Sequence, residues 1–142
     1  MITSILVALD DTAMAPHVLA AATEVAERFD ARLYLFRAVL VPPEFPAAAA
    51  DATSDDPLPE HLVKQAEDDL RRLAAGNARA SAERPIVGFG DPWRAIVAIV
   101  DRLDVDLIVA GSHAYHWPDR ILGTVAAKLA NRGPRNLLIV RH

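Results

Sequence analysis

The sequence predicts an α/β domain built on a single doubly wound parallel sheet of five strands, with helices on both faces. Short apolar runs without polar alternation recur along the chain, as in strands that are covered on both faces. Amphipathic helical patterns separate these runs. The 142 residues have the length of one domain. The regular alternation therefore predicts one sheet with right-handed crossovers.

The predicted elements follow one another as strand and helix in turn. The five strands cover residues 4–9, 33–39, 85–89, 106–110 and 136–141. Three helices have an apolar stripe at helical spacing, formed by Val18, Leu19, Ala22, Val25, Ala26 and Phe29, then by Leu62, Val63, Ala66, Leu70 and Leu73, then by Ile96, Val97, Val100 and Leu103. A fourth helix covers residues 124–131.

One long connection interrupts this rhythm, at about residues 42–59. It is rich in proline and alanine, and Phe45 is almost its only large apolar residue, so we expect a flexible segment between the second strand and the second helix. Two interpretations stay open: a solvated surface connection, or a lid or partner-binding segment.

Composition excludes several classes of protein. The net charge of −4 argues against nucleic acid and against an anionic membrane as partners. The chain has no cysteine, which excludes disulfides, thiolate zinc sites and cysteine nucleophiles. No apolar stretch approaches the ~20 residues that cross a bilayer, and the N-terminus does not resemble a signal peptide. We therefore expect a cytoplasmic protein.

Ligands of open parallel sheets bind beyond the carboxyl ends of the strands, where the winding of the chain reverses. If the first strand neighbours the fourth, the loops after these two strands converge there. The stretch GSHAYHWPDRILGTVA (residues 111–126) follows the fourth strand. Gly111 and Gly123 let backbone approach an anion, and the hydroxyls of Ser112 and Thr124 add hydrogen bonds. The alternative is a tight turn at Gly111 and a helix cap at Thr124, without a ligand.

Two adjacent carboxylates, Asp10 and Asp11, follow the first strand. They are able to hold a divalent cation, or Asp11 or Thr12 simply caps the first helix. In GFGDPW (residues 88–93) the dinucleotide-like pattern lacks its third glycine, so we interpret Asp91 as the cap of a helix that begins at Pro92. A P-loop is absent, and no nucleophile with a general base is evident.

Taken together, these residues resemble the universal stress protein family over nearly the whole chain. The resemblance is carried by ILVALDDT (residues 5–12), GSHA (111–114), LGTVA (122–126) and the final apolar strand LLIV (137–140). It implies a fold like that of the adenine nucleotide alpha hydrolases and a single domain over residues 1–142. It also implies a role in stress response.

In one branch of the family the resemblance further implies bound ATP or AMP, possibly with Mg²⁺ at Asp10, and at most slow ATP hydrolysis. The adenosine then contacts Ala8, Leu9, Asp10 and Ala38. The phosphates then contact the strand end and loop at Ala110, Gly111, Ser112, His113, Ala114, Gly123, Thr124 and Val125. A second branch lacks the glycine loop, and the alternative function is a dimeric interaction protein that binds no nucleotide.

The glycine loop departs from the family pattern. Ala114 replaces the second glycine, Trp117 and Pro118 stiffen the loop, and eight residues rather than nine precede Gly123. A left-handed alanine at position 114 costs about 1–2 kcal/mol, which weakens a micromolar affinity roughly tenfold to thirtyfold without abolishing it.

The last strand, Asn136 to Arg141, ends the predicted order and is expected at an edge of the sheet. An exposed apolar edge is an aggregation hazard unless another chain covers it. The family resemblance implies dimers that pair through this strand. We therefore expect a homodimer, together with a protein partner that the sequence does not identify.

Overall fold

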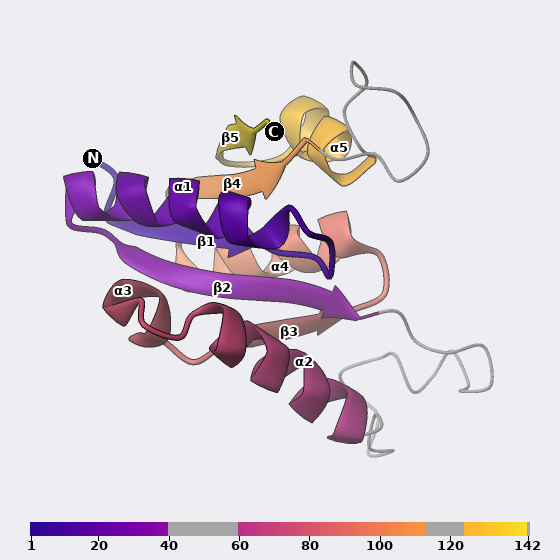
Figure 1. The fold of residues 1–142 in the computed structure, drawn as a ribbon. Helices are drawn as coiled ribbons and strands as arrows, with labels where there is room; N and C mark the ends of the chain where they lie inside the picture. The colour runs from indigo at the N-terminus through magenta and orange to yellow at the C-terminus, as the bar shows by residue number, and fades with distance from the viewer. Residues whose placement is uncertain (40–59, 113–123, 142) are drawn as a thin grey trace.

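The computed structural model describes residues 1–39, 60–112 and 124–141, and it confirms the predicted fold class. Five parallel strands form one sheet in the order β3-β2-β1-β4-β5 (Figure 1). The strands are β1 (Ser4–Ala8), β2 (Arg32–Val39), β3 (Ile86–Phe89), β4 (Leu107–Gly111) and β5 (Asn136–Val140). Where an end of a strand differs from the prediction, it differs by one residue.

The helices are α1 (Ala15–Phe29), α2 (Glu60–Leu73), α3 (Ala78–Ser81), α4 (Pro92–Leu103) and α5 (Thr124–Arg132). Helix α3 was not predicted, because four residues are too few to show a helical period. Its local signal is the cap: the Asn77 side chain accepts a hydrogen bond from the Ala80 N–H at 3.0 Å. No helix in the described ranges is long and apolar enough to span a membrane.

Two apolar cores lie on the two faces of the sheet. Alternate strand residues such as Ile5 and Val7 pack with α1 and with the end of α2, while Leu6 and Ile108 pack with α4 and α5. All four of these side chains have no exposed surface. Burial on both faces explains why the strands show continuous apolar runs rather than alternation.

The predicted stripe of α1 is wrong at its last position. Phe29 is 51% exposed, whereas Val18, Leu19, Ala22 and Ala26 are buried. Phe29 is the final residue of α1, and the chain then reverses through Asp30 in a left-handed conformation (φ 51°). Helical spacing indicates the side on which a residue lies, but it does not say whether a neighbour covers that turn of the helix.

At the amino edge of the sheet, Asp106 ties the start of β1 to the start of β4. Its Oδ2 atom accepts hydrogen bonds from the Thr3 N–H at 2.8 Å, the Thr3 hydroxyl at 2.9 Å and the Ser4 N–H at 3.0 Å. The bond from the Thr3 N–H, followed by those from the Thr3 hydroxyl and the Ser4 N–H, lowers the pKa of Asp106 below its ordinary value.

The lowered pKa of Asp106 predicts a loss of stability in acid. Because the pKa is lower in the folded state than in the unfolded state, the ionised carboxylate stabilises the fold above its unfolded pKa of about 3.9. This contribution disappears as the pH falls through the folded pKa. We expect Asp106→Asn to reduce the difference between the urea midpoints at pH 7 and pH 3. Thr3→Val, which removes one donor, is expected to lie between wild type and Asp106→Asn. An unchanged difference in Asp106→Asn would contradict this account.

Candidate functional site

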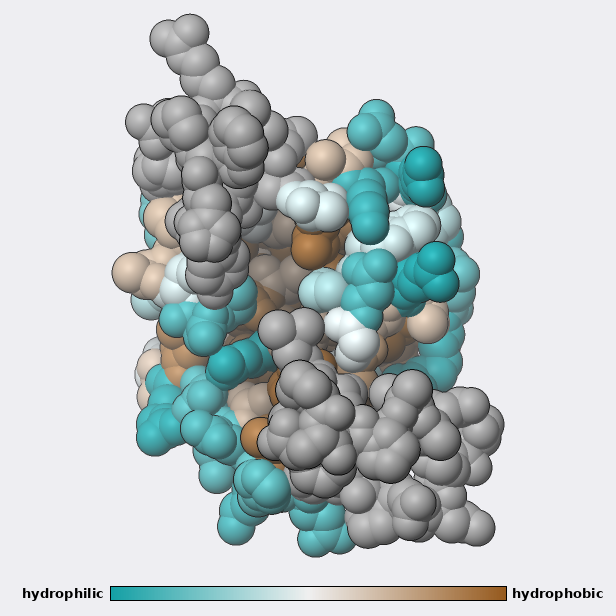
Figure 2. Space-filling model, turned by 90° about the vertical axis from the view of Figure 1, so that its right-hand side faces the viewer, coloured by the Kyte–Doolittle hydropathy of each residue, from teal (hydrophilic) through white to brown (hydrophobic). Residues whose placement is uncertain are grey.

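The carboxyl ends of β1 and β4 lie side by side, where the winding of the chain reverses. Ala8 of β1 pairs with Phe36 of β2 on one side and with Ala110 of β4 on the other. Residues one or two positions beyond this level therefore leave the sheet together, among them Asp10 and Ser112. The sequence analysis expected the loops after the first and fourth strands to converge if these strands were neighbours, and β1 and β4 are neighbours. Figure 2 looks onto this edge and shows apolar residues exposed near its centre.

Side chains at this edge divide between the two faces of the sheet. Ala8 and Ala38 are half-buried and pack against the core on the α4 and α5 side. Leu9 points the other way: it is 5% exposed and belongs to the core beneath α1. The Leu9 N–H donates to the Phe36 carbonyl at 2.8 Å. Of the residues predicted to contact adenosine, Leu9 therefore has only its carbonyl to offer to a ligand.

Asp10 organises the turn that leads into α1. Its Oδ1 atom accepts the Thr12 N–H at 3.0 Å and the Thr12 hydroxyl at 2.5 Å. The helix begins only at Ala15, with Met14 in the N-cap position and no side-chain cap. The N-cap position predicted for Asp11 or Thr12 is therefore wrong. Thr12 instead belongs to the turn before the helix, where its hydroxyl accepts the Met14 N–H at 3.3 Å and its carbonyl accepts the Ala15 N–H.

Metal binding by protein ligands alone finds no support at this edge. Within the ranges that the structure describes, no group of three or more histidine, aspartate or glutamate side chains gathers where a metal ion would fit. One oxygen of Asp10 is already engaged by Thr12. A cation at Asp10 would need most of its oxygen ligands from water or from a bound anion.

The structure extends β4 by one residue, to Gly111. Gly111 pairs with Val140 of β5, and the Ser112 N–H donates to the Val140 carbonyl at 3.0 Å. A Cβ atom at position 111 would lie 3.2 Å from Val18 Cγ2 of α1, so close packing beneath α1 favours glycine here. The interpretation of Gly111 as a tight turn is wrong, because Gly111 has the backbone conformation and the pairing of a strand residue. Ser112 is 9% exposed at the end of this strand.

The remaining predicted residues lie around the start of α5. Thr124 is the first helical residue described and is exposed, and Val125 is half-buried against the α4 and α5 core. His113, Ala114 and Gly123 lie outside the described residues, as do Trp117 and Pro118.

In the β3–α4 loop, the position predicted for Asp91 is confirmed, but the predicted role of its side chain is not. Asp91 occupies the N-cap position of α4 and Pro92 begins the helix, as predicted, but the Asp91 side chain makes no capping hydrogen bond. Its Oδ2 atom lies 3.9 Å from Nζ of Lys128 on α5. Lys128 was missed, although its spacing of four residues from Thr124 on a predicted helix placed both on one face.

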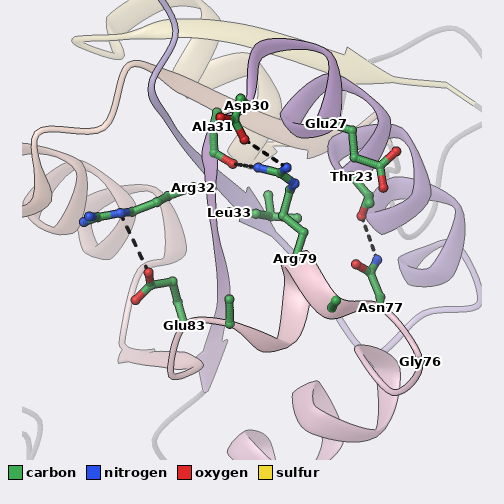
Figure 3. Close-up of a pocket in the computed structure, with 12 residues that line it drawn as sticks. Thr23, Glu27, Asp30, Ala31, Arg32, Leu33, Gly76, Asn77, Arg79 and Glu83 are labelled. Carbon is green, nitrogen blue, oxygen red and sulfur yellow. Dashed lines mark hydrogen bonds and ion pairs between the residues drawn. The ribbon is translucent and has the colours of Figure 1, made fainter.

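A hollow of about 750 Å³ lies at the opposite, amino edge of the sheet, between the end of α1, the start of β2 and α3 (Figure 3). Its polar groups bind one another: the Asn77 amide donates to the Thr23 hydroxyl at 2.9 Å, and Arg79 donates to the Ala31 carbonyl at 2.7 Å and pairs with Asp30 at 3.2 Å. These contacts tie α3 to α1 and to the turn between α1 and β2, so we assign this hollow a structural role.

Comparisons with known proteins agree with this geometry. The model of the universal stress protein family matches residues 1–141. Universal stress protein A homolog 2 of Coxiella burnetii is 28% identical over 120 residues, which cover 84% of this chain and 81% of that protein.

Solved structures match over nearly the full chain. Universal stress protein UspA from Lactobacillus plantarum has a TM-score of 0.76 at 24% identity, with 98% of this chain and 97% of that chain covered. A universal stress protein solved in complex with cAMP has a TM-score of 0.66 at 24% identity, with 99% and 97% covered.

Proposed function

The chain belongs to the universal stress protein family, and from this premise we propose that it binds an adenine nucleotide, ATP or AMP, as part of a stress response. The observation that carries the proposal is the meeting of β1 and β4 at the point where the chain reverses, a position that favours ligand binding in open parallel sheets. The solved relative in complex with cAMP supports the class of ligand.

On one face of the sheet, the ends of β1 and β2 have small side chains, which is where we propose that the nucleoside lies. In the proposed complex the adenosine lies over Ala8 and Ala38, which project toward the α4 and α5 side. The phosphates lie beyond Gly111 and Ser112 and near Thr124, where the first amides of α5 favour an anion. His113, Ala114 and Gly123 complete the proposed site.

We propose that Mg²⁺ binds together with the phosphates of the nucleotide and not to the protein alone. Asp10 contributes a carboxylate oxygen, and the phosphates and water supply the other ligands. Turnover is at most slow, because the described residues offer no nucleophile paired with a general base at this edge.

A homodimer through β5 is the second part of the proposal. This strand forms an edge of the sheet, and its residues Leu137, Leu138 and Ile139 are only half-buried. Pairing with a second copy would satisfy the edge backbone and cover these side chains. We also propose a cytoplasmic location and an engaged protein partner. A dimeric interaction protein without nucleotide is the alternative that the next experiment decides.

Mass spectrometry of small molecules released from gently purified protein tests the proposal without presuming a ligand. We expect an adenine nucleotide, and saturable binding of labelled ATP with magnesium at roughly tens of micromolar, which is micromolar affinity reduced by the alanine at position 114. If no nucleotide is retained and no saturable binding is seen at high micromolar ATP, nucleotide binding is rejected and the dimeric interaction protein remains. Light scattering on the same sample reports the dimer independently.

A further inference from the structure

The ion pair between Asp91 and Lys128 joins the N-cap residue of α4 to the second turn of α5. The two helices pack against each other on one face of the sheet, and both begin at its carboxyl edge (Figure 1). The pair is long, at 3.9 Å, and the Lys128 and Asp91 side chains are 40% and 44% exposed. Such an exposed pair contributes little stability, so an exchange of partners is inexpensive.

Asp91 has a second set of hydrogen-bond donors within its own helix. Its backbone has the extended conformation of an N-cap residue (φ −65°, ψ 116°), yet its carboxylate caps nothing. The Trp93 and Arg94 N–H groups stand at the positions that an N-cap aspartate ordinarily accepts from. If Lys128 leaves, Asp91 is therefore already placed to cap α4.

Lys128 also has a second class of partner. It lies one helical turn after Thr124, on the same face of α5, because residues four apart are neighbours on a helix surface. Thr124 is where the proposed phosphates approach α5. A di- or triphosphate group brings more negative charge toward Lys128 than the single carboxylate of Asp91 does.

Resting on the proposed function, we propose that Lys128 is the residue that makes affinity depend on the number of phosphates. On binding of a di- or triphosphate, Lys128 exchanges Asp91 for the terminal phosphate groups, and the Asp91 carboxylate turns to accept hydrogen bonds from the first amides of α4. The ligand class selected is a nucleoside polyphosphate over a nucleoside. The bound phosphate charge is thereby transmitted to the start of α4.

Titrations of adenosine, AMP and ATP against the full-length protein test the selectivity. We expect Lys128→Ala to weaken ATP about tenfold and adenosine less than about twofold, with Lys128→Arg restoring most of the ATP affinity. Asp91→Asn, which frees Lys128 but keeps a capping side chain, is expected to tighten ATP a few fold. Arg132→Ala removes a cation from the last turn of the same helix and is the matched control, expected to change neither ligand. Equal losses for ATP and adenosine in Lys128→Ala would overturn the inference.

Amide NMR signals of Trp93 and Arg94 test the exchange separately from nucleotide recognition. Inorganic tripolyphosphate is expected to shift both signals in the wild type and not in Lys128→Ala. In Asp91→Asn without any ligand, both signals are expected to be shifted already, relative to the ligand-free wild type. If adenosine and all nucleotides fail to bind while tripolyphosphate produces this pattern, the proposed function fails and the exchange stands. If ATP binds without moving either signal, the exchange fails and the proposed function stands.

Discussion

Replacing Ser112 by aspartate is expected to weaken ATP binding about a hundredfold. Ser112 directly follows β4, donates its N–H to the Val140 carbonyl of β5 and is 9% exposed, so a carboxylate there has little solvent around it. A second negative charge about 4 Å away costs about 4 kcal/mol at an effective dielectric constant of about 20, and solvent at the open edge reduces this. A loss of about 2.7 kcal/mol of binding free energy corresponds to the hundredfold change in affinity. Calorimetric titration of ATP with magnesium measures this change.

Two variants separate this electrostatic effect from damage to the fold. Ala82→Asp adds the same charge at an exposed residue near the amino edge and is expected to leave ATP affinity unchanged. Ser112→Ala keeps the strand end and removes only the hydroxyl, so we expect a loss of about threefold to tenfold. Circular dichroism confirms that each variant is folded. A folded Ser112→Asp protein with wild-type affinity would place the phosphates elsewhere.

Replacing Phe36 by alanine is expected to lower the free energy of unfolding by about 3–5 kcal/mol. Phe36 lies in β2, is 1% exposed and, among the residues that the structure describes, has the largest fully buried side chain, in the core beneath α4 and α5. A domain is typically stable by about 5–15 kcal/mol, so this loss is a large share of the total. Urea denaturation followed by circular dichroism measures it.

Phe29 provides the matched control for Phe36. It is the same residue type, but it is 51% exposed at the end of α1. We expect Phe29→Ala to change the free energy of unfolding by less than about 1 kcal/mol. Similar losses in the two variants would mean that the burial of Phe36 does not account for its contribution.

Gly88 of β3 gives a second check on the same packing. A Cβ atom there would lie 2.8 Å from Cε2 of the Phe36 ring and 3.1 Å from Cβ of Ala95. Gly88→Ala is therefore destabilising in the wild type, by about 1–3 kcal/mol. In the Phe36→Ala background the ring is gone, so the same methyl group is expected to cost less.

The ends of the strands were predictable from the sequence, whereas the directions of the side chains near those ends were not. Asp10 and Ser112 follow apolar runs, so their place at the carboxyl edge was readable from the sequence. Leu9 sits in the same run, but the alternation of a strand turns its side chain into the core beneath α1. Asp91 stands at the predicted N-cap, yet its partner is Lys128, which is distant in sequence.

The sequence alone determined the succession of strands and helices, because buried strands and amphipathic helices leave periodic signals over a few neighbouring residues. It also placed the loops in which a nucleotide is proposed to bind. Only the tertiary structure decided that β1 lies between β2 and β4, that Phe29 is exposed and that Asp91 faces Lys128 rather than its own helix. Each of these depends on a contact between segments far apart in the chain, and local periodicity carries no record of which segments meet.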